Sequence, residues 1–351
     1  MSWLALQSFP ETVLITGGAE FIGSQLASVL LRRGCKVAVF DNLNDFYEPE
    51  LKRANLTEIG RDGPFDFVFG DISDRAAMRD VLARLRPAVV VHLAARAGVR
   101  PSVENPELYY ETNVAGMENV LAACRDFETP KVVFASSSSV YGTLSATPFR
   151  EDALLLSPAS PYAATKLAGE AMLHSFVNCY GLQGVVLRFF TVYGPRQRPD
   201  LAISKFVRLI RNDEPIQLFG DGSSARDYTW IDDILSGVLA AMAYQPPNGY
   251  DVFNLGSSRP ISLDEMVGLI EEAMGKRAKR LYTDRAVGDM TVTSADIAKA
   301  EGFLGYHPAT TIAEGIRRYV DWALQQHAPT PRNSVAGRGG AEEATSEPRA
   351  F

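Results

Sequence analysis

Residues Thr12-Val13-Leu14-Ile15-Thr16-Gly17-Gly18-Ala19-Glu20-Phe21-Ile22-Gly23 form an apolar run followed by a glycine-rich turn. The run is typical of a short buried strand, and an apolar-periodic helix follows the turn through Leu31. A turn between a strand and a helix N-terminus binds phosphate, because the free backbone N–H groups there attract an anion. The stretch therefore predicts a site for a dinucleotide pyrophosphate.

A carboxylate after the second predicted strand indicates which dinucleotide fits. The strand 36–40 ends at Asp41, about twenty residues beyond the turn. A carboxylate there accepts hydrogen bonds from an adenosine ribose and repels a 2′-phosphate, so the sequence favours NAD over NADP. Asp71 and Ile72 follow the predicted strand 66–69 and are the expected contacts to adenine.

One position of the turn departs from a Gly-x-x-Gly-x-x-Gly spacing, because Glu20 replaces the middle glycine. That glycine normally lets the backbone approach the pyrophosphate closely. Glu20 either turns to solvent and weakens cofactor binding modestly, or marks a chain that has lost NAD binding. We favour the first interpretation, since the other cofactor positions are intact.

Tyr162 and Lys166 are candidate catalytic residues. They lie four residues apart in a predicted helix over 162–180, so their side chains project from one face. An ammonium beside a phenol, helped by the positive nicotinamide of an oxidised cofactor, favours the phenolate. Tyr162 is thus the expected base, and a cluster of serines at 136–139 precedes it in the chain.

Strands and helices alternate through the first two thirds of the chain, with strands at 89–93, 131–136 and 184–189 and helices at 105–126 and 162–180. Alternation of this kind predicts an α/β fold with a doubly wound parallel sheet (Rossmann), whose ligands bind at the C-terminal ends of the strands. We expect an NAD-binding domain over 1–190 and a smaller C-terminal substrate-binding lobe over 191–327, with segments that return to the first domain. The tail 328–351 is rich in small and charged residues and is expected to be disordered.

Composition excludes several classes of function. The 351 residues carry 35 basic and 42 acidic side chains, a net charge of -7 without any run of Lys or Arg, so nucleic acid is not an expected partner. Cys35, Cys124 and Cys179 show no metal spacing and are expected to be reduced core thiols of a cytoplasmic protein. We predict no metal, no membrane span and no secretion signal.

The motifs together resemble the extended short-chain dehydrogenase/reductases that act on nucleotide sugars, from about Thr12 to about Leu324. Within that family the chain is most similar to the UDP-glucuronate 4-epimerases. The resemblance rests on "TGGAEFIG", "FDNLNDFYEPELKRANL", "VHLAARAGVRPSVENP", "NV", "SSSSVYG", "YAATK", "LRFFTVYGPRQRPD", "GDGSSARDYTWIDD" and "GDMTVTSAD".

The resemblance implies a catalytic set of Ser137, Tyr162 and Lys166, in which Lys166 also holds the nicotinamide ribose and lowers the pKa of the phenol. The implied NAD contacts are Gly17, Phe21, Ile22, Gly23, Asp41, Asn42, Asp71, Ile72, Leu93, Ala94, Ala95, Asn113, Tyr162, Lys166 and Phe189. His92, inside an apolar strand, is expected to be a core histidine and no ligand.

The residues after Ser137 indicate the reaction. Related 4,6-dehydratases carry an Asp-Glu pair there, and related UDP-glucuronate decarboxylases carry Glu at the second position, whereas this chain has Ser138 and Ser139. The resemblance therefore implies epimerisation through a transient 4-ketone, with NAD regenerated in each cycle.

Other positions bear on the substrate. Galactose-type epimerases generally have Asn where this chain has Thr191, and Arg198 could grip a sugar carboxylate in a bidentate fashion or meet only phosphate or solvent. The implied substrate contacts are Arg100, Ser137, Ser138, Ser139, Thr191, Arg198, Arg226 and Asp289. Arg100 could equally be a salt-bridging loop residue.

Alternative functions remain open from the sequence: a UDP-glucose or UDP-N-acetylglucosamine 4-epimerase, a UDP-glucuronate decarboxylase, or a non-catalytic nucleotide-sugar-binding protein. The resemblance also implies a homodimer, in which the helices at about 105–126 and 162–180 of each subunit pack into a four-helix interface.

Overall fold

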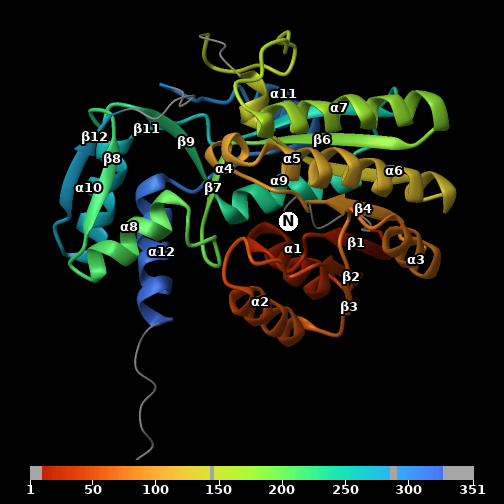
Figure 1. Ribbon diagram of the computed structural model, residues 1–351, viewed down its shortest axis with the longest axis horizontal. Coiled ribbons are helices and arrows are strands. Elements are labelled where there is room, and N and C mark those ends of the chain that lie inside the picture. Colours follow the sequence, from red (N-terminus) through yellow and green to blue (C-terminus); the bar gives the residue numbers. More distant parts are fainter. Residues whose placement is uncertain (1–9, 143–145, 285–290, 327–351) are drawn as a thin grey trace, which may run out of the picture.

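A parallel sheet of seven strands, in the order β10-β6-β5-β4-β1-β2-β3, forms the centre of the described protein (Figure 1). The computed structural model describes residues 10–142, 146–284 and 291–326. The strands are β1 (Thr12–Thr16), β2 (Lys36–Asp41), β3 (Asp66–Phe69), β4 (Val89–His92), β5 (Lys131–Ser137), β6 (Gln183–Phe189) and β10 (Tyr250–Leu255). The predicted doubly wound α/β fold is confirmed.

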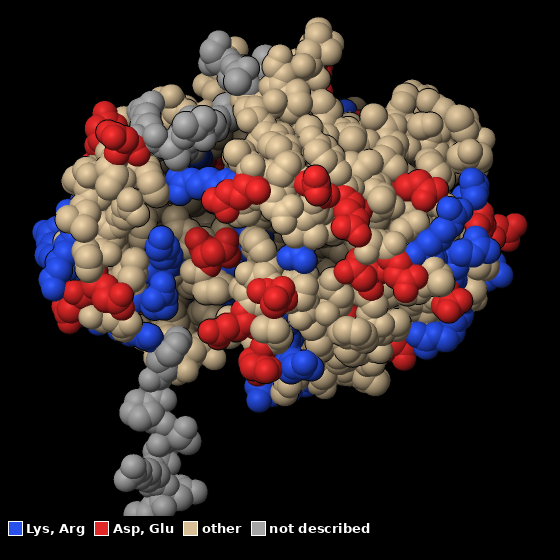
Figure 2. Space-filling model, viewed as in Figure 1, with Lys and Arg blue, Asp and Glu red and all other residues tan. Residues whose placement is uncertain are grey.

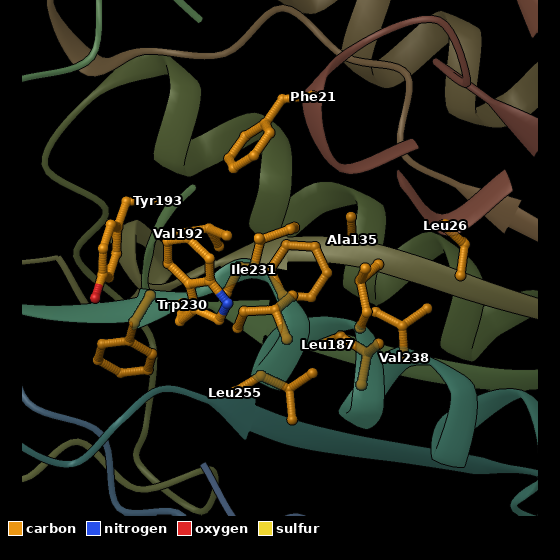
Figure 3. Packing of buried hydrophobic residues seen from close by; sticks show 14 of the residues in the cluster. Phe21, Leu26, Ala135, Leu187, Val192, Tyr193, Trp230, Ile231, Val238 and Leu255 are labelled. Carbon is orange, nitrogen blue, oxygen red and sulfur yellow. The ribbon is translucent and has the colours of Figure 1, made fainter. Parts of the chain in front are cut away.

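Alternate residues of the strands feed two hydrophobic cores, one on each face of the sheet. In β1, Val13 and Ile15 belong to one core and Leu14 to the other. Helices α1 (Phe21–Arg32), α2 (Pro49–Asp62) and α9 (Ile231–Ala243) cover the first face. Helices α3 (Arg75–Leu85), α6 (Gly116–Asp126) and α7 (Pro161–Tyr180) cover the second. Figure 3 shows Ile231 and Val238 of α9 among the side chains of the first core, with Leu187 and Leu255 of the sheet nearby.

The helix expected over 105–126 is present, but it is not uniform. It comprises α5 (Pro106–Tyr110), a π-helical turn (Glu111–Ala115) and α6, and a short helix α4 (Val99–Glu104) precedes it. Asn105 caps α5 by accepting a hydrogen bond from the Leu108 backbone. A π turn is rare and is found mostly near functional sites, and this one carries Asn113.

A smaller lobe follows β6. It contains the sheet β11-β9-β7, formed by β7 (Thr191–Tyr193), β9 (Ala225–Trp230) and β11 (Pro260–Ser262), and the pair β8 (Pro215–Phe219) and β12 (Lys279–Thr283). Helices α8 (Ala202–Arg211), α10 (Leu263–Met274) and α12 (Ile312–Gln325) pack beside these strands (Figure 1). Between them the chain returns to the large sheet through α9 and β10, and α11 (Ala298–Leu304) lies against β10.

The strand order places the functional region. β1 pairs with β2 on one side and with β4 on the other, so the connections that leave β1 and β4 run to opposite faces of the sheet. In such sheets a crevice opens at the carboxyl ends of the strands where the order reverses. The glycine turn after β1, the segment after β4 and the serines at the end of β5 all lie at this edge.

Candidate active site

The glycine turn is built for close approach of the backbone. Gly17 has a φ of +71°, and a Cβ there would lie 2.7 Å from the backbone nitrogen of Ala94. A Cβ on Gly23 would lie 2.3 Å from the carbonyl oxygen of Gly17. Both positions thus require glycine. Because Phe21 and Ile22 begin α1, their backbone N–H groups face an anion bound at the helix N-terminus.

Glu20 is bound by a neighbouring helix and is not simply directed to solvent. Its carboxylate forms an ion pair with Lys52 of α2, with 2.9 Å between Oε1 and Nζ. The Lys52 side chain is fully buried, whereas 28% of the Glu20 side chain is exposed. The expectation that Glu20 simply turns to solvent is therefore wrong.

A pocket next to the turn collects most of the residues predicted to hold the adenosine half of NAD. Asp41 is buried, and its carboxylate accepts hydrogen bonds from the backbone N–H groups of Ala19, at 3.0 Å, and Leu43, at 2.8 Å. Burial, together with the negative charge of Glu20, raises the pKa of Asp41 to about 6. The lining comprises Gly17, Glu20, Phe40, Asp41, Asn42, Asn44, Gly70, Asp71, Ile72, Ala94, Ala95, Arg96 and Thr112.

Asn42 and Asp71 form a hydrogen bond at this pocket, in which the Asn42 amide donates to the Asp71 carboxylate at 2.5 Å.

Asn113, another predicted NAD contact, is buried, and its side chain forms hydrogen bonds with other protein groups. Its Nδ2 donates to the Arg96 carbonyl and to Thr165 Oγ1, at 3.0 Å each, and its Oδ1 accepts from the Arg96 backbone. Asn113 therefore fixes the segment after β4 to α7.

Ser137 and Tyr162 meet at the carboxyl ends of β5 and β6. Ser137 ends β5, and its Oγ lies 3.2 Å from Ser139 Oγ. Tyr162 lies in the first turn of α7, which Ser160 caps through the Ala163 N–H. Burial raises the pKa of Tyr162, while a hydrogen bond with Ser137 and the charge of Arg198 lower it. The hydroxyl and the phenol are thus within hydrogen-bonding reach.

Lys166 is buried one turn after Tyr162 and is held by the end of β5. Its buried Nζ donates to the Ala135 carbonyl at 2.7 Å and lies 5.0 Å from the ring centroid of Phe134. Burial lowers the pKa of Lys166 to about 8, and the carboxylate of Glu170 raises it. In this structure Ser137 and Arg198 lower the pKa of Tyr162, and the effect of Lys166 on the phenol stays a prediction.

A buried polar network supports these residues from behind. Glu170, one turn after Lys166, pairs with Arg188 of β6 at 2.7 Å, and each side chain is only 5% exposed. Glu170 also accepts a hydrogen bond from Ser136, and Arg188 donates to the Tyr141 hydroxyl at 3.0 Å. Sequence reasoning missed this network, because its partners come from distant parts of the chain.

Several residues predicted to bind the sugar lie at the end of β6 and in the segment after β7. Phe189 pairs in register with Ser137, and Thr191 begins β7. Arg198 is bound to Asp200 and lies 5.1 Å from the ring centroid of Phe46. The positive charge of Arg198 lowers the pKa of Tyr162. Ser138 and Ser139 form a 3-10 turn over Ser138–Tyr141.

A second pocket lies between the large domain and the small lobe and contains Arg100, Lys205 and Arg226. Arg100 is an exposed residue of α4, its guanidinium lies 4.0 Å from the ring centroid of Phe219, and it lines this pocket. The pocket lining is Arg100, Asp200, Ala202, Lys205, Phe206, Gln217, Phe219, Ser224, Arg226, Tyr228 and Leu263. Figure 2 shows Lys or Arg side chains along the hollow between the two lobes. The sequence did not indicate Lys205, and Asp289 lies outside the described residues.

The remaining candidates are structural. His92 is buried, with Nδ1 2.7 Å from Thr16 Oγ1, and burial lowers its pKa to about 3, so it stays neutral. Cys35 and Cys124 are buried free thiols, but Cys179 is exposed, so the prediction of three core thiols is wrong for Cys179. Among the described residues, no group of His, Cys, Asp and Glu could hold a metal ion.

The residues fit NAD. The Gly17 and Gly23 positions would be filled by any Cβ, the helix N-terminus of α1 lies beside them, and the buried Asp41 lines the adjoining pocket. Comparison with known proteins agrees, because residues 13–256 match the NAD dependent epimerase/dehydratase family. The chain belongs to this family.

Similar members of the family share most of the chain. A UDP-glucuronate 4-epimerase of Thermodesulfobacterium geofontis is 43% identical over 89% of this chain and 96% of its own length. The crystal structure of a Bacillus cereus UDP-glucuronic acid 4-epimerase with UDP-glucuronic acid and NAD has a TM-score of 0.84 and 34% identity, and the match covers 90% of this chain and 100% of that one. A UDP-glucose 4-epimerase of Thermotoga maritima, solved with UDP-glucose, has a TM-score of 0.83 and 32% identity over 90% of this chain and 99% of its own.

These two solved relatives differ in sugar but hardly in fold similarity, so the fold alone does not select the sugar. Within the described ranges, the structure contains no helix long and apolar enough to cross a membrane.

Proposed function

We propose that this chain is an NAD-dependent 4-epimerase that interconverts UDP-glucuronate and UDP-galacturonate through a transient 4-ketone. The observation that carries the proposal is the arrangement of Ser137, Tyr162 and the two serines that follow Ser137. It supplies one hydroxyl and one phenol for proton transfer at a single sugar oxygen, and no acid for elimination. The similarity to the Thermodesulfobacterium geofontis and Bacillus cereus enzymes supports the choice of substrate.

The proposed chemistry is a reversible oxidation. Tyr162 takes the proton from the sugar 4-hydroxyl, and Ser137 holds that oxygen by a hydrogen bond. When bound, NAD supplies a hydride acceptor that returns the hydride later. The protonated Lys166 keeps positive charge beside the phenolate. Turning of the 4-ketose about its diphosphate link exposes its other face, and Tyr162 then gives the proton back.

The same site has to prevent decarboxylation. Oxidation at C4 of a glucuronate gives a β-keto acid, which loses carbon dioxide when the bond between C5 and C6 aligns with the ketone. A guanidinium can fix a carboxylate in a bidentate fashion. We assign this clamp to Arg198, whose charge already acts on Tyr162. Thr191 at the start of β7, and Ser138 and Ser139, complete the sugar contacts.

The pocket at Arg100 and Arg226 is our proposed site for the UDP group. Two guanidinium groups and the Lys205 ammonium suit a diphosphate, and Phe219 and Tyr228 offer apolar faces for a base. Asp289 stays a prediction for the uridine ribose.

Incubation of the purified protein with UDP-glucuronate, UDP-glucose or UDP-N-acetylglucosamine, followed by chromatographic separation of the products, tests the proposal. We expect UDP-galacturonate from UDP-glucuronate and slow or no conversion of the neutral sugars. UDP-xylose as the main product would indicate a decarboxylase, and preferred turnover of UDP-glucose would indicate a galactose-type epimerase.

We also infer a homodimer formed through α7 and its neighbours. Lys166 and Glu170 of α7 are buried, so the exposed surface of this helix carries no Asp, Glu, Lys or Arg. Figure 2 shows that the surface over α7 is largely free of Lys, Arg, Asp and Glu. Such a face suits a second copy of the same helix around a two-fold axis.

We place the enzyme in the cytoplasm, a choice supported by its three free cysteines.

A further inference from the structure

The ion pair of Glu20 and Lys52 has a specific setting. Lys52 Nζ lies 2.9 Å from Glu20 Oε1 and 3.0 Å from Asn44 Oδ1, and it lies 4.6 Å from the ring centroid of Tyr47. One turn further along α2, Asn55 donates to the Ala19 carbonyl at 2.9 Å. Helix α2 therefore holds the glycine turn from behind and brings a buried cation to it.

Glu20 and Asn44 line the same pocket as Asp41, the carboxylate expected to meet the adenosine ribose. Glu20, Asp41 and Lys52 interact electrostatically, because the charge of Glu20 raises the pKa of Asp41 and the charge of Lys52 lowers it. Two carboxylates thus line the ribose end of the cofactor pocket, and the Lys52 ammonium lies buried behind one of them, Glu20, which binds it.

This arrangement bears on which dinucleotide can bind. NADP carries an additional phosphate on the 2′ position of the adenosine ribose, and a cation near that position is what accommodates it. Lys52 would be such a cation, but its charge is neutralised by Glu20. A buried ammonium keeps its charge only when a counterion is present, so either Glu20 or a phosphate can fill this role.

We propose that Glu20 determines cofactor specificity. Its carboxylate pairs with Lys52 and adds a second negative charge beside Asp41, so that Lys52 cannot bind the 2′-phosphate of NADP. The inference rests on NAD as the cofactor in the proposed function. It gives a purpose to the departure of Glu20 from the glycine pattern, since the glutamate reinforces NAD preference without leaving an uncompensated charge at the pyrophosphate turn.

Removal of Glu20 separates this proposal from a purely structural role. In Glu20→Ala the buried Lys52 loses its counterion and becomes available to a 2′-phosphate. NADP binding should then improve much more than NAD binding, because only NADP carries the added charge. In the double variant Glu20→Ala/Lys52→Met this gain should vanish, since the cation is absent. Arg198 also lies within electrostatic reach of Glu20, but Asp200, which binds Arg198 in the parent, is unchanged in both variants.

The experiment is calorimetric titration of the full chain with NAD and with NADP, without any UDP-sugar. The proteins are the parent, Glu20→Ala, the double variant and Glu50→Ala. Glu50 is the matched control: it lies on α2, the helix that carries Lys52, and its carboxylate pairs with Arg53 on the surface. Thermal unfolding without nucleotide checks that each variant is folded.

We expect the ratio of the NADP to the NAD dissociation constant to fall about tenfold or more in Glu20→Ala, to return toward the parent value in the double variant, and to stay unchanged in Glu50→Ala. An unchanged ratio in Glu20→Ala, or an equal fall with and without Lys52, overturns the proposal. If the parent binds neither nucleotide, the cofactor assignment fails and this inference with it. A parent that binds NAD but gives no epimerised product contradicts only the proposed reaction.

Discussion

Arg198 and Asp200 form a bidentate pair, with Nε 3.0 Å from Oδ1 and Nη2 2.9 Å from Oδ2. The Arg198 side chain is 14% exposed, whereas that of Asp200 is 49% exposed. The guanidinium is therefore held in place inside the site by a carboxylate that can turn out to solvent. A sugar carboxylate offers the same two oxygen atoms, and we propose that it replaces Asp200.

Replacement of Arg198 by methionine should reduce kcat/KM for UDP-glucuronate more than for UDP-glucose, by about tenfold to a hundredfold, because only the first carries a carboxylate to be held. Any loss of kcat/KM that arises because Arg198 no longer acts on Tyr162 affects both substrates and cancels in the comparison between them. Steady-state kinetics on both substrates measures the two values of kcat/KM. Asp200→Asn is the matched variant, and it should lower KM for UDP-glucuronate, since the fork is freed. Equal losses on both sugars would show that Arg198 does not meet the carboxylate.

Replacement of Tyr162 by phenylalanine should lower kcat by about a hundredfold to ten-thousandfold while NAD and UDP still bind, because only the proton-transferring oxygen is lost. Turnover and calorimetric titration with both ligands test this. Tyr180→Phe at the exposed end of the same helix is the control and should remain active. Near-normal activity of Tyr162→Phe would rule out the phenol as the acid and base.

NAD affinity should fall as the pH is lowered from 7 to 5. Burial raises the pKa of Asp41 to about 6, so its carboxylate becomes protonated within this window and loses an acceptor for the ribose hydroxyls. The fall should approach about tenfold at one pH unit below the pKa. Titration with NAD at several pH values measures it. Asp41→Asn should bind more weakly at pH 7 and show little dependence on pH, and a flat profile in the parent would contradict the ribose role of Asp41.

Introduction of charge on α7 should separate the proposed dimer. Ser175 and Asn178 are exposed on this helix, and glutamates at both positions of each subunit would face like charges across a two-fold interface. Light scattering at micromolar concentration should give twice the chain mass for the parent and the single chain mass for the double variant. Charged substitution of Glu58 by lysine on α2 is a control that should leave the dimer intact. A monomeric parent would refute the interface.

The sequence predicted the parts of the site that depend on local patterns. The turn at Gly17 and Gly23 and the spacing of Tyr162 and Lys166 follow from a strand, a turn or a helix, whose geometry is set by neighbouring residues. Lys52 was missed because its burial and its contact with Glu20 depend on how α2 packs on α1. The pair of Glu170 and Arg188 was missed for the same reason. Lys205 gave no signal, since a lone lysine on an amphipathic helix is usually solvated.

The most direct measurement is proton NMR of the purified protein with UDP-glucuronate in deuterated water. Because the hydrogen at C4 moves as hydride and returns to the same carbon, the account predicts UDP-galacturonate that keeps hydrogen at C4, with no pentose product. Deuterium at C4 would contradict hydride return, and UDP-xylose as the main product would contradict control of the β-keto acid by the site.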